Sequence, residues 1–294
     1  MTGPEISVVI VTYNSSDVIG RCLASLREHS PHDTVEVIVV DNASSDGTPD
    51  LIRRDFPWVL VFECGDNAGV SAGVNVGVSF SQGPYIATIN PDCRFDADAL
   101  TPLTAYLRDH PDVGIVAPQL LDDDGAVQLS CRAFPGYATA LFSRYSPLTR
   151  LLPGNRFSRR YLMSGFDHAS LRDVDWVSGA AMMFPRPVYD RLRGWDERFF
   201  LFSEDVDFCK RVHDAGLRVV YDPSVRVTHR IGISANPTSR VIVERHRSMW
   251  RYYRKHLRRN PPVDALTAAA IAARCALLLT TTAATRPLRR PPAP

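Results

Sequence analysis

The stretch ISVVIVTYNSSDVIGRCLASLREHSPHDTVEVIVVDNAS, residues 6–44, decides the fold. Its first apolar run, residues 6–11, is short and rich in β-branched side chains, which is typical of a strand buried on both faces. Residues 16–28 follow with apolar side chains at helical spacing and Ser15 or Ser16 as an N-cap, and a second β-branched run occupies residues 35–40. This order predicts a parallel βαβ unit.

The same alternation continues along the chain. We expect helices near residues 47–54 and 69–81 and strands near 58–63 and 85–89. The pattern predicts an α/β protein with a doubly wound, Rossmann-like, mostly parallel sheet. After residue 113 the rhythm changes, and strands at 113–118 and 126–131 are expected to flank a hairpin turn at residues 122–125.

The rest of the chain is less regular. Residues 132–172 are rich in proline and arginine, and we expect a mobile loop that faces the substrate. Beyond it the patterns predict a strand at 174–184, helices at 186–192 and from 203 to 215, strands at 219–221 and 225–229, and a basic helix at 238–258. The basic helix and the Ala-rich residues that follow it predict a C-terminal helical extension.

The composition excludes several classes of protein. The 294 residues carry 34 Lys and Arg against 32 Asp and Glu, so the net charge of +2 does not call for a nucleic-acid partner. The six cysteines form no C-x-x-C pair, which favours buried reduced thiols and a reducing, cytoplasmic compartment. Residues 1–5 lack the features of a secretory signal, so export is not expected.

The C-terminal segments suggest contact with a membrane surface. Residues 245–259 combine basic side chains with Trp250 and two tyrosines. They form either a solvated face or a cover for the core, or they hold the chain on anionic lipid or near a lipid-linked diphosphate acceptor. Residues 263–285 are long enough to span a bilayer. Asp264, Arg274 and the many small residues favour a peripheral or partner-packed helix, with a spanning helix as the alternative.

Acidic and amide side chains follow two predicted strands. Asp41 comes directly after residues 35–40, where its carboxylate either accepts a hydrogen bond from a nucleoside or caps the next turn. Asn90-Pro91-Asp92 follows residues 85–89. Its carboxylate either binds Mg²⁺ or Mn²⁺ beside a diphosphate or belongs to a turn that Asn-Pro begins.

Three glycines, Gly69, Gly73 and Gly77, are spaced four residues apart in a predicted helix. They give that helix a smooth face for close packing on the sheet. Asn67 precedes the helix, and its alternative role is to contact a phosphate at the helix start.

Glu204 and Asp205 fall in the first turn of a predicted helix, where the helix dipole favours acids whatever their function. The functional alternative makes Asp205 a general base that takes a proton from a sugar hydroxyl. His229 ends a predicted strand and is either hydrogen-bonded or a second metal ligand.

Taken in order, these motifs resemble family 2 glycosyltransferases over about residues 5–232. The segments that carry the resemblance are residues 7–14, residues 41–48, Asn67-x-Gly69 with Asn75-x-Gly77, Asn90-Pro91-Asp92 and residues 203–207. Residues 179–182, 194–197 and 199–200 extend it toward the rhamnosyltransferase-like branch. The resemblance implies a GT-A fold, a nucleotide-sugar donor, a divalent metal (Mg²⁺ or Mn²⁺) and inversion at the anomeric carbon.

The resemblance also implies roles for particular residues. It places Thr12, Tyr13, Asn14 and Asp41 at the nucleoside, with Asn67, Asn90 and Asp92 toward the diphosphate and its metal. It makes Asp205 the base, Glu204 its neighbour on the acceptor side, and His229 a contact of the metal or diphosphate. The family's D-x-D motif reads Asn90-Pro91-Asp92 here, so one acidic ligand is missing and His229 gains weight as the partner of Asp92.

On this basis we expect a glycosyltransferase domain at 1–235 and a membrane-associating extension at 236–294. Residues 1–112 would bind the nucleotide sugar and residues 113–235 the acceptor. The sharpest hypothesis is transfer of L-rhamnose from dTDP-L-rhamnose to a polyprenyl-diphosphate-linked saccharide at the inner face of the plasma membrane, by a monomer or homo-oligomer. The alternatives are another donor sugar, or a catalytically silent subunit that binds sugar nucleotides or glycans.

Overall fold

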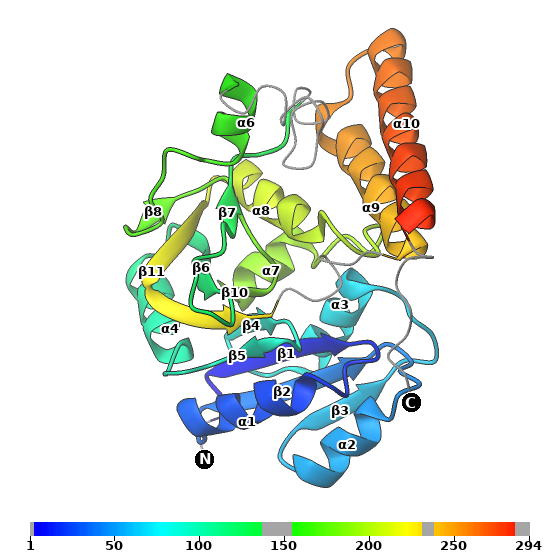
Figure 1. The fold of residues 1–294 in the computed structure, drawn as a ribbon. Helices are drawn as coiled ribbons and strands as arrows, with labels where there is room; N and C mark the ends of the chain where they lie inside the picture. Colours follow the sequence, from blue (N-terminus) through cyan, green and yellow to red (C-terminus); the bar gives the residue numbers. More distant parts are fainter. Residues whose placement is uncertain (1–2, 137–154, 231–237, 286–294) are drawn as a thin grey trace.

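One mixed sheet organises the chain (Figure 1). The computed structural model describes residues 3–136, 155–230 and 238–285. Its strands are β1 (Ile6–Thr12), β2 (Val35–Asp41), β3 (Leu60–Glu63), β4 (Tyr85–Ile89), β5 (Cys93–Arg94), β6 (Val113–Leu121), β7 (Cys131–Arg132), β8 (Arg172–Asp173), β9 (Trp176–Val177), β10 (Ala181–Pro185) and β11 (Arg218–His229). The nine-stranded sheet has the order β3-β2-β1-β4-β10-β6-β11-β5, with β8 paired to β11, while β7 and β9 pair separately.

The sheet confirms the predicted α/β class. Strands β3, β2, β1 and β4 are parallel neighbours, and so are β6 and β11. The antiparallel strand β10 lies between β4 and β6 and joins the two parallel sections. The result is a doubly wound, mostly parallel mixed sheet in which the carboxyl ends of β1 and β2 lie at one edge.

Helices cover both faces of the sheet. They are α1 (Ile19–His29), α2 (Thr48–Asp55), α3 (Val70–Phe80), α4 (Leu100–Asp109), α6 (Arg156–Tyr161), α7 (Arg186–Leu192), α8 (Glu204–Asp214), α9 (Ser239–Tyr252) and α10 (Pro261–Thr285). One core contains apolar side chains of α1, α2 and α4, and the other contains those of α3 and α8. This two-sided burial explains why the strands read as continuous apolar runs.

The glycine face of α3 packs against the sheet as predicted. A Cβ atom added at Gly73 would lie 2.7 Å from Val11 Cγ1, and one at Gly77 would lie 2.4 Å from Val9 Cγ1. Because real Cβ atoms do not approach other carbons so closely, only glycine allows this helix to lie so near β1.

Several predicted elements differ in detail. The predicted strand at 174–184 is interrupted between β9 and β10, where the Gly179 N–H donates to Asp205 Oδ2 at 3.0 Å. The predicted strand at 126–131 is mostly irregular: the Ser130 N–H bonds back to Gln128 O, Val127 forms an isolated bridge with Leu121, and Cys131 begins β7 and pairs with Val177. The two strands predicted at 219–229 form the single strand β11, whose register shifts between Asp222 and Arg226.

The segment predicted as an irregular loop, residues 132–172, contains more structure than expected. It holds α6 and a residue each of β7 and β8, while residues 137–154 of the predicted mobile loop lie outside the described residues. The sequence patterns did not predict helix α4. The N-cap predicted at Ser15 or Ser16 is wrong: α1 begins at Ile19, because the Ser15 and Ser16 N–H groups bond to Thr48 Oγ1 and Asp46 Oδ2.

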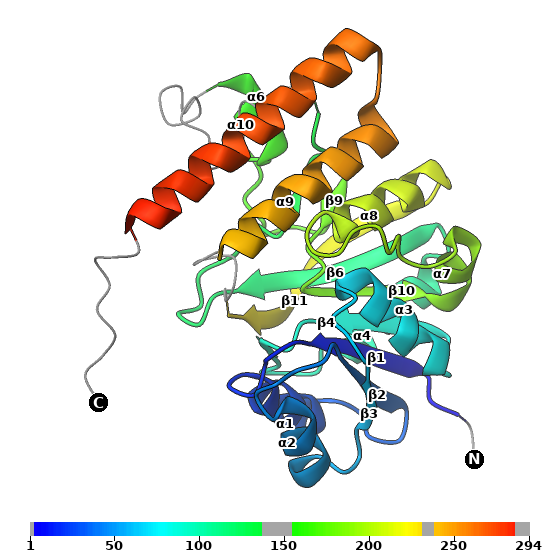
Figure 2. The same cartoon turned by 90° about the vertical axis from the view of Figure 1, so that its right-hand side faces the viewer.

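The C-terminal extension consists of α9 and α10, which lie side by side (Figure 2). Helix α9 ends at Tyr252 and continues as a π-helical turn, Tyr253–Leu257, instead of the regular helix predicted to 258. The turn directs Lys255 Nζ and His256 Nε2 to the buried Asp207 Oδ1, each at 2.7 Å. The extension is therefore anchored to α8.

Helix α10 is exposed over most of its surface. Residues 261–282 are long and apolar enough, by length and composition, to cross a membrane, and only 6% of the most apolar window is buried. Both a peripheral helix and a spanning helix can have this length and composition.

Candidate active site

The carboxyl ends of β1 and β2 are tied together by Asp41. Its buried carboxylate accepts the Thr12 hydroxyl at 2.8 Å, and the Ser44 hydroxyl and N–H at 2.6 and 2.8 Å. These bonds confirm the turn-capping interpretation of Asp41. A contact between Asp41 and a nucleoside remains a prediction.

Tyr13 and Asn14 present the accessible surface of this sheet edge. The Tyr13 side chain is 43% exposed. Asn14 adopts a left-handed backbone conformation, with a φ of 50°, and its Oδ1 accepts the Ser45 N–H at 2.8 Å. The loop therefore has a fixed shape, and the exposed Tyr13 ring is suited to stack on a flat ligand.

The start of α3 lies beside this loop. Asn67 Oδ1 accepts the Gly69 N–H at 3.1 Å, and Asn42 Nδ2 donates to Gly69 O at 3.0 Å. Gly69 has a φ of 90°, and a Cβ there would lie 2.4 Å from Phe200 O. Asn67 therefore holds the backbone at the start of α3. A phosphate contact by this residue remains a prediction.

The structure brings Asp92 and His229 together. Asp92 Oδ1 lies 3.4 Å from His229 Nε2, because the antiparallel pairing of β5 with β11 sets Cys93 opposite His229. Asp92 Oδ1 is buried and has no hydrogen-bond partner within the described residues. Asn90 holds the turn before it through its backbone, since its N–H donates to Ala180 O at 2.8 Å and its carbonyl accepts the Cys93 N–H.

Gln128, which the sequence gave no reason to select, orients His229. Gln128 Nε2 donates to Asp122 Oδ1 and to His229 O, each at 2.6 Å, so its Oε1 is the atom that faces His229 Nδ1 at 3.0 Å. An amide oxygen accepts, and Nδ1 must therefore carry the proton. In the neutral imidazole, Nε2 then presents its lone pair to Asp92.

This arrangement fits a cation. A carboxylate oxygen without a donor and an imidazole lone pair face each other, and a positive charge between them would satisfy both. Within the described residues no group of three or more His, Cys, Asp or Glu side chains is arranged to hold a metal. Asp92 and His229 would supply two ligands, and a bound diphosphate and water would have to complete the coordination.

Glu204 and Asp205 begin α8 after two strained residues. Phe202 and Ser203 have φ angles of 68° and 65°, a left-handed conformation that non-glycine residues rarely adopt twice in succession. Asp205 Oδ2 accepts the Gly179 N–H at 3.0 Å, and Oδ1 accepts the Val206 N–H at 2.8 Å. Glu204 Oε2 is buried and has no hydrogen-bond partner in the part of the chain described.

The environment separates the two carboxylic acids. Burial raises the pKa of Glu204 well above its usual value, and the charge of Asp205 raises it further. Burial also raises the pKa of Asp205, but the N–H groups of Gly179 and Val206 and the charge of Arg132 oppose that rise. Asp205 is consequently the acid that ionises first, while Glu204 keeps its proton.

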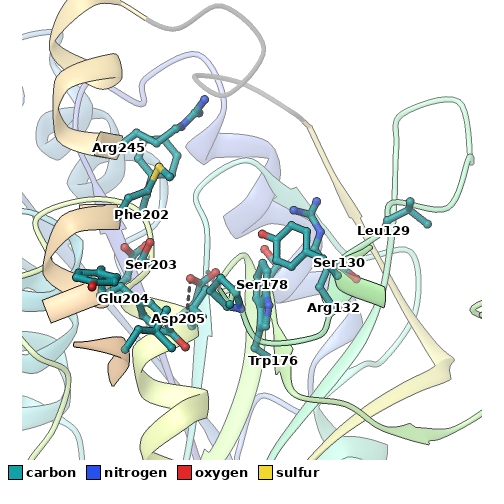
Figure 3. Close-up of a pocket in the computed structure, with 18 of the residues that line it drawn as sticks. Leu129, Ser130, Arg132, Trp176, Ser178, Phe202, Ser203, Glu204, Asp205 and Arg245 are labelled. Carbon is teal, nitrogen blue, oxygen red and sulfur yellow. Dashed lines mark hydrogen bonds between the residues drawn. The ribbon is translucent and has the colours of Figure 1, made fainter. Parts of the chain in front are cut away.

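Both acids line a cavity of about 490 Å³ (Figure 3). Figure 3 shows Glu204 and Asp205 on one side and Arg132 with Trp176 on the other. The lining includes residues from β7, β9, β11, α6, α8, α9 and α10 and from loops: Gln128, Ser130, Arg132, Tyr161, Trp176, Ser178, Glu204, Asp205, His229, Arg245, Tyr252, Thr267, Ile271 and Arg274. His229 thus shares the cavity with Asp205, whereas Thr12, Tyr13, Asn14, Asp41, Asn67, Asn90 and Asp92 are outside its lining.

Comparisons with known proteins identify the family of the chain. The profile described as glycosyl transferase family 2 matches residues 7–166, more than half of the chain. The chain is 29% identical over 267 residues (83% of it and 86% of the relative) to N-acetylglucosaminyl-diphospho-decaprenol L-rhamnosyltransferase of Mycobacterium tuberculosis. It is 22% identical over 254 residues (85% and 77%) to dTDP-rhamnosyl transferase RfbF of Shigella flexneri.

A solved structure shares the fold. A mannosyltransferase from Pyrobaculum calidifontis, in complex with GDP-Man and Mn²⁺, superposes with a TM-score of 0.60. The two sequences are 21% identical, and the superposition covers 97% of this chain and 81% of the other. The family match includes Asp41, at the end of β2, and Asp92, which lies between β4 and β5.

Proposed function

This chain belongs to glycosyl transferase family 2, and we propose that it is an inverting enzyme that moves L-rhamnose from dTDP-L-rhamnose to N-acetylglucosaminyl-diphospho-polyprenol. The names of two relatives support this donor and acceptor, since one uses dTDP-rhamnose and the other adds L-rhamnose to a decaprenol-linked sugar. Glycosyltransferase activity itself follows from the family.

The observation that carries the proposal is the ionisable Asp205 at the wall of the cavity. An inverting transfer requires one base that removes a proton from the attacking hydroxyl while the leaving group departs on the opposite side. Asp205 is held by the Gly179 and Val206 N–H groups, so its carboxylate has a fixed direction. Its raised pKa makes it a stronger base than an ordinary aspartate.

Glu204 has a different proposed role. As a buried neutral acid beside Asp205, it has a proton to donate and contributes no second negative charge to repel the base. It would hydrogen-bond a hydroxyl of the acceptor sugar and orient it toward Asp205. Two neighbouring acids thereby take two roles, which their environments decide.

We assign donor binding to the edge formed by β1, β2, α3 and β4. Tyr13 would stack on the base, Thr12, Asn14 and Asp41 would hold the shape of the nucleoside site, and Asn67 would approach the phosphates. Asp92 and His229 would hold Mg²⁺ or Mn²⁺, with Asn90 fixing the turn. Such a cation would neutralise charge on the departing diphosphate, and the Mn²⁺ in the Pyrobaculum structure supports this assignment.

We propose a matching division of the chain. Residues 1–112 bind the nucleotide sugar, residues 113–235 carry the base and the acceptor site, and residues 236–294 hold the protein at the cytoplasmic face of a membrane. The exposed apolar surface of α10 and the basic residues of α9 support that placement, because basic side chains attract anionic lipid at about 1 kcal/mol each.

A donor panel tests the function. Full-length protein is incubated with nucleotide sugars, Mg²⁺ or Mn²⁺, and N-acetylglucosaminyl-diphospho-polyprenol, and release of nucleoside diphosphate is measured. We expect release from dTDP-L-rhamnose, dependent on the acceptor, with appearance of a rhamnosylated lipid. Release from another donor would replace the sugar in the proposal, and no release from any donor would contradict transfer to this acceptor.

A further inference from the structure

Two arginines that the proposed mechanism does not use line the cavity beside the base. Arg132 is on β7 and Arg274 is on α10, and Tyr161 of α6 lies with them in the cavity wall. The Arg132 guanidinium is 5.9 Å from the centre of the Tyr161 ring. The two cations and this phenol thus line one cavity.

Arg132 is held in position by aromatic rings instead of acids. Its guanidinium lies 5.5 Å from the centre of the Trp176 ring, in addition to its contact with Tyr161. Its Nε is buried without a hydrogen-bond partner, and it has no ion pair within residues 3–136, 155–230 and 238–285. A buried donor on a charged group without an acceptor is costly unless a ligand satisfies it.

Arg274 is the basic residue of α10 in the cavity wall. It lies on the same helix face as Thr267 and Ile271, which also line the cavity. Burial lowers the pKa of Arg274, and no carboxylate in the described parts of the chain forms an ion pair with it. Arginine remains charged in spite of such a shift, so its guanidinium is a partly desolvated cation.

Apolar side chains also line the cavity that contains these arginines. Trp176, Tyr252, Leu257 and Ile271 line the same cavity, and α10 itself exposes Leu266 and Leu277. A ligand that fits this lining combines an anion with a hydrocarbon chain. A nucleotide sugar has the anion and lacks the chain.

We propose that Arg132 and Arg274 bind the diphosphate of the polyprenyl-diphosphate acceptor, with α10 forming part of the site. This inference rests on the proposed function and assigns its acceptor to particular residues. Guanidinium groups bind phosphate oxygens through paired, charge-assisted hydrogen bonds. The diphosphate would lie next to the acceptor sugar at Asp205, and the lipid chain would extend along α10 toward the membrane.

Binding of farnesyl diphosphate, a soluble polyprenyl diphosphate, tests the inference without turnover. Isothermal titration calorimetry is applied to the full chain and to Arg132→Gln and Arg274→Gln. Because hydrogen bonds to charged groups are strong, each substitution is expected to weaken binding roughly 10-fold or more. Arg160→Gln, an exposed arginine of α6 outside the cavity lining, is the matched control and should bind like the parent.

The nature of the ligand is tested in the same titrations. Farnesyl monophosphate should bind more weakly than the diphosphate, and farnesol should lose the dependence on both arginines. dTDP should not displace farnesyl diphosphate. Displacement by dTDP would assign the arginines to the donor and overturn the inference, as would equal affinity for farnesyl diphosphate in the parent and in both variants.

Failure of the inference differs from failure of the proposed function. Sugar transfer to the lipid acceptor with an unchanged acceptor KM in Arg132→Gln and Arg274→Gln would contradict the inference alone. Arginine-dependent binding of farnesyl diphosphate by a protein that transfers no rhamnose would contradict the proposed function alone. Thermal melting of each variant, with Arg132→Lys as a second substitution that keeps the charge, separates loss of binding from loss of folding.

Discussion

The neighbouring side chains Glu204 and Asp205 differ in how readily they ionise because their surroundings differ. Asp205 receives two backbone N–H groups and the field of Arg132, whereas Glu204 Oε2 receives no partner within the described residues. Burial raises the pKa of both, but more interactions favour the ionised form of Asp205 than favour that of Glu204. Their order in the chain could not reveal this difference.

We predict that Glu204→Gln stabilises the protein at neutral pH. The pKa of Glu204 is raised in the folded state, so its contribution to stability is present at low pH and is lost as the pH rises toward that raised value. Gln stays neutral, and the gain in Tm over the parent should be small below about pH 4 and grow above it. Thermal melts across pH measure this, and a gain that does not change with pH would contradict the assignment.

Gln128→Leu should weaken binding of a divalent cation. Without Gln128 the His229 ring loses the acceptor that keeps its proton on Nδ1, and loss of such an outer contact typically costs 10–100-fold in metal affinity. Electron paramagnetic resonance of free Mn²⁺, titrated with protein and dTDP, measures the affinity. Gln82→Leu, at an exposed glutamine, is the control. Equal Mn²⁺ affinity in the parent and Gln128→Leu would exclude the role of Gln128.

At the residue scale the sequence predicted Asp92 and His229 as partners, and the structure brings them to 3.4 Å. The pairing was expected because the family resemblance leaves one acidic ligand missing beside Asp92 and because both residues lie next to predicted strands. Gln128 lies in a predicted strand that is mostly irregular, and Arg132 lies at the start of the segment predicted as a loop. No local signal distinguishes such single polar residues from ordinary surface side chains.

At the scale of elements, α3 illustrates a structure that its glycines require. We predict that Gly77→Ala costs about 1–3 kcal/mol, because its Cβ would lie 2.4 Å from Val9 Cγ1. Gly20→Ala in α1 is the matched control: its nearest atom, Phe56 Cε2, is 4.0 Å away. Alanine there should be neutral or stabilise by up to about 1 kcal/mol. Urea unfolding of both variants tests this, and similar midpoints would contradict close packing of α3.

Two elements depart from the predicted pattern for reasons visible only in three dimensions. The predicted strand is interrupted between β9 and β10 because the Gly179 N–H donates to Asp205 Oδ2. Helix α9 widens into a π-helical turn because Lys255 and His256 both reach Asp207. Hydrogen bonds and charges hold the pKa of Asp207 below its usual value against the opposing effect of burial. Hydrophobic periodicity contains no information about either contact.

At the scale of the whole molecule, the sequence predicted the alternation of strands and helices but not the order of all strands. The segment from β1 to β4 follows from local βαβ units. The insertion of β10 between β4 and β6 joins residues far apart in the chain, and only tertiary packing decides it. The cavity lined by Asp205 of α8 also contains His229 of β11.

We predict that the exposed face of α10 binds membranes. Leu266 and Leu277 lie about three helical turns apart on one face, and changing both to Asp should abolish most binding to vesicles that contain anionic lipid. Leu60→Asp on the edge strand β3 is the control, since that leucine is also exposed (48%, against 53% for Leu277) and β3 is distant from α10. Vesicle flotation at low and high salt measures binding, and salt should weaken it.

Carbonate extraction distinguishes the two interpretations of α10. A peripheral helix should be released from membranes into the soluble fraction. Retention of the protein in the membrane after carbonate treatment would contradict peripheral binding and favour a spanning helix.

The most direct test is transfer of labelled L-rhamnose from dTDP-L-rhamnose to the lipid-linked acceptor by the parent and by Asp205→Asn, with dTDP-L-rhamnose binding measured in parallel. General-base catalysis contributes about 10²–10⁴-fold, so the variant should lose at least that much rate and keep its donor affinity. Transfer by the parent should rise with pH through the raised pKa of Asp205, since the ionised form is active. Equal rates in the parent and the variant would contradict the assignment of Asp205 as the base.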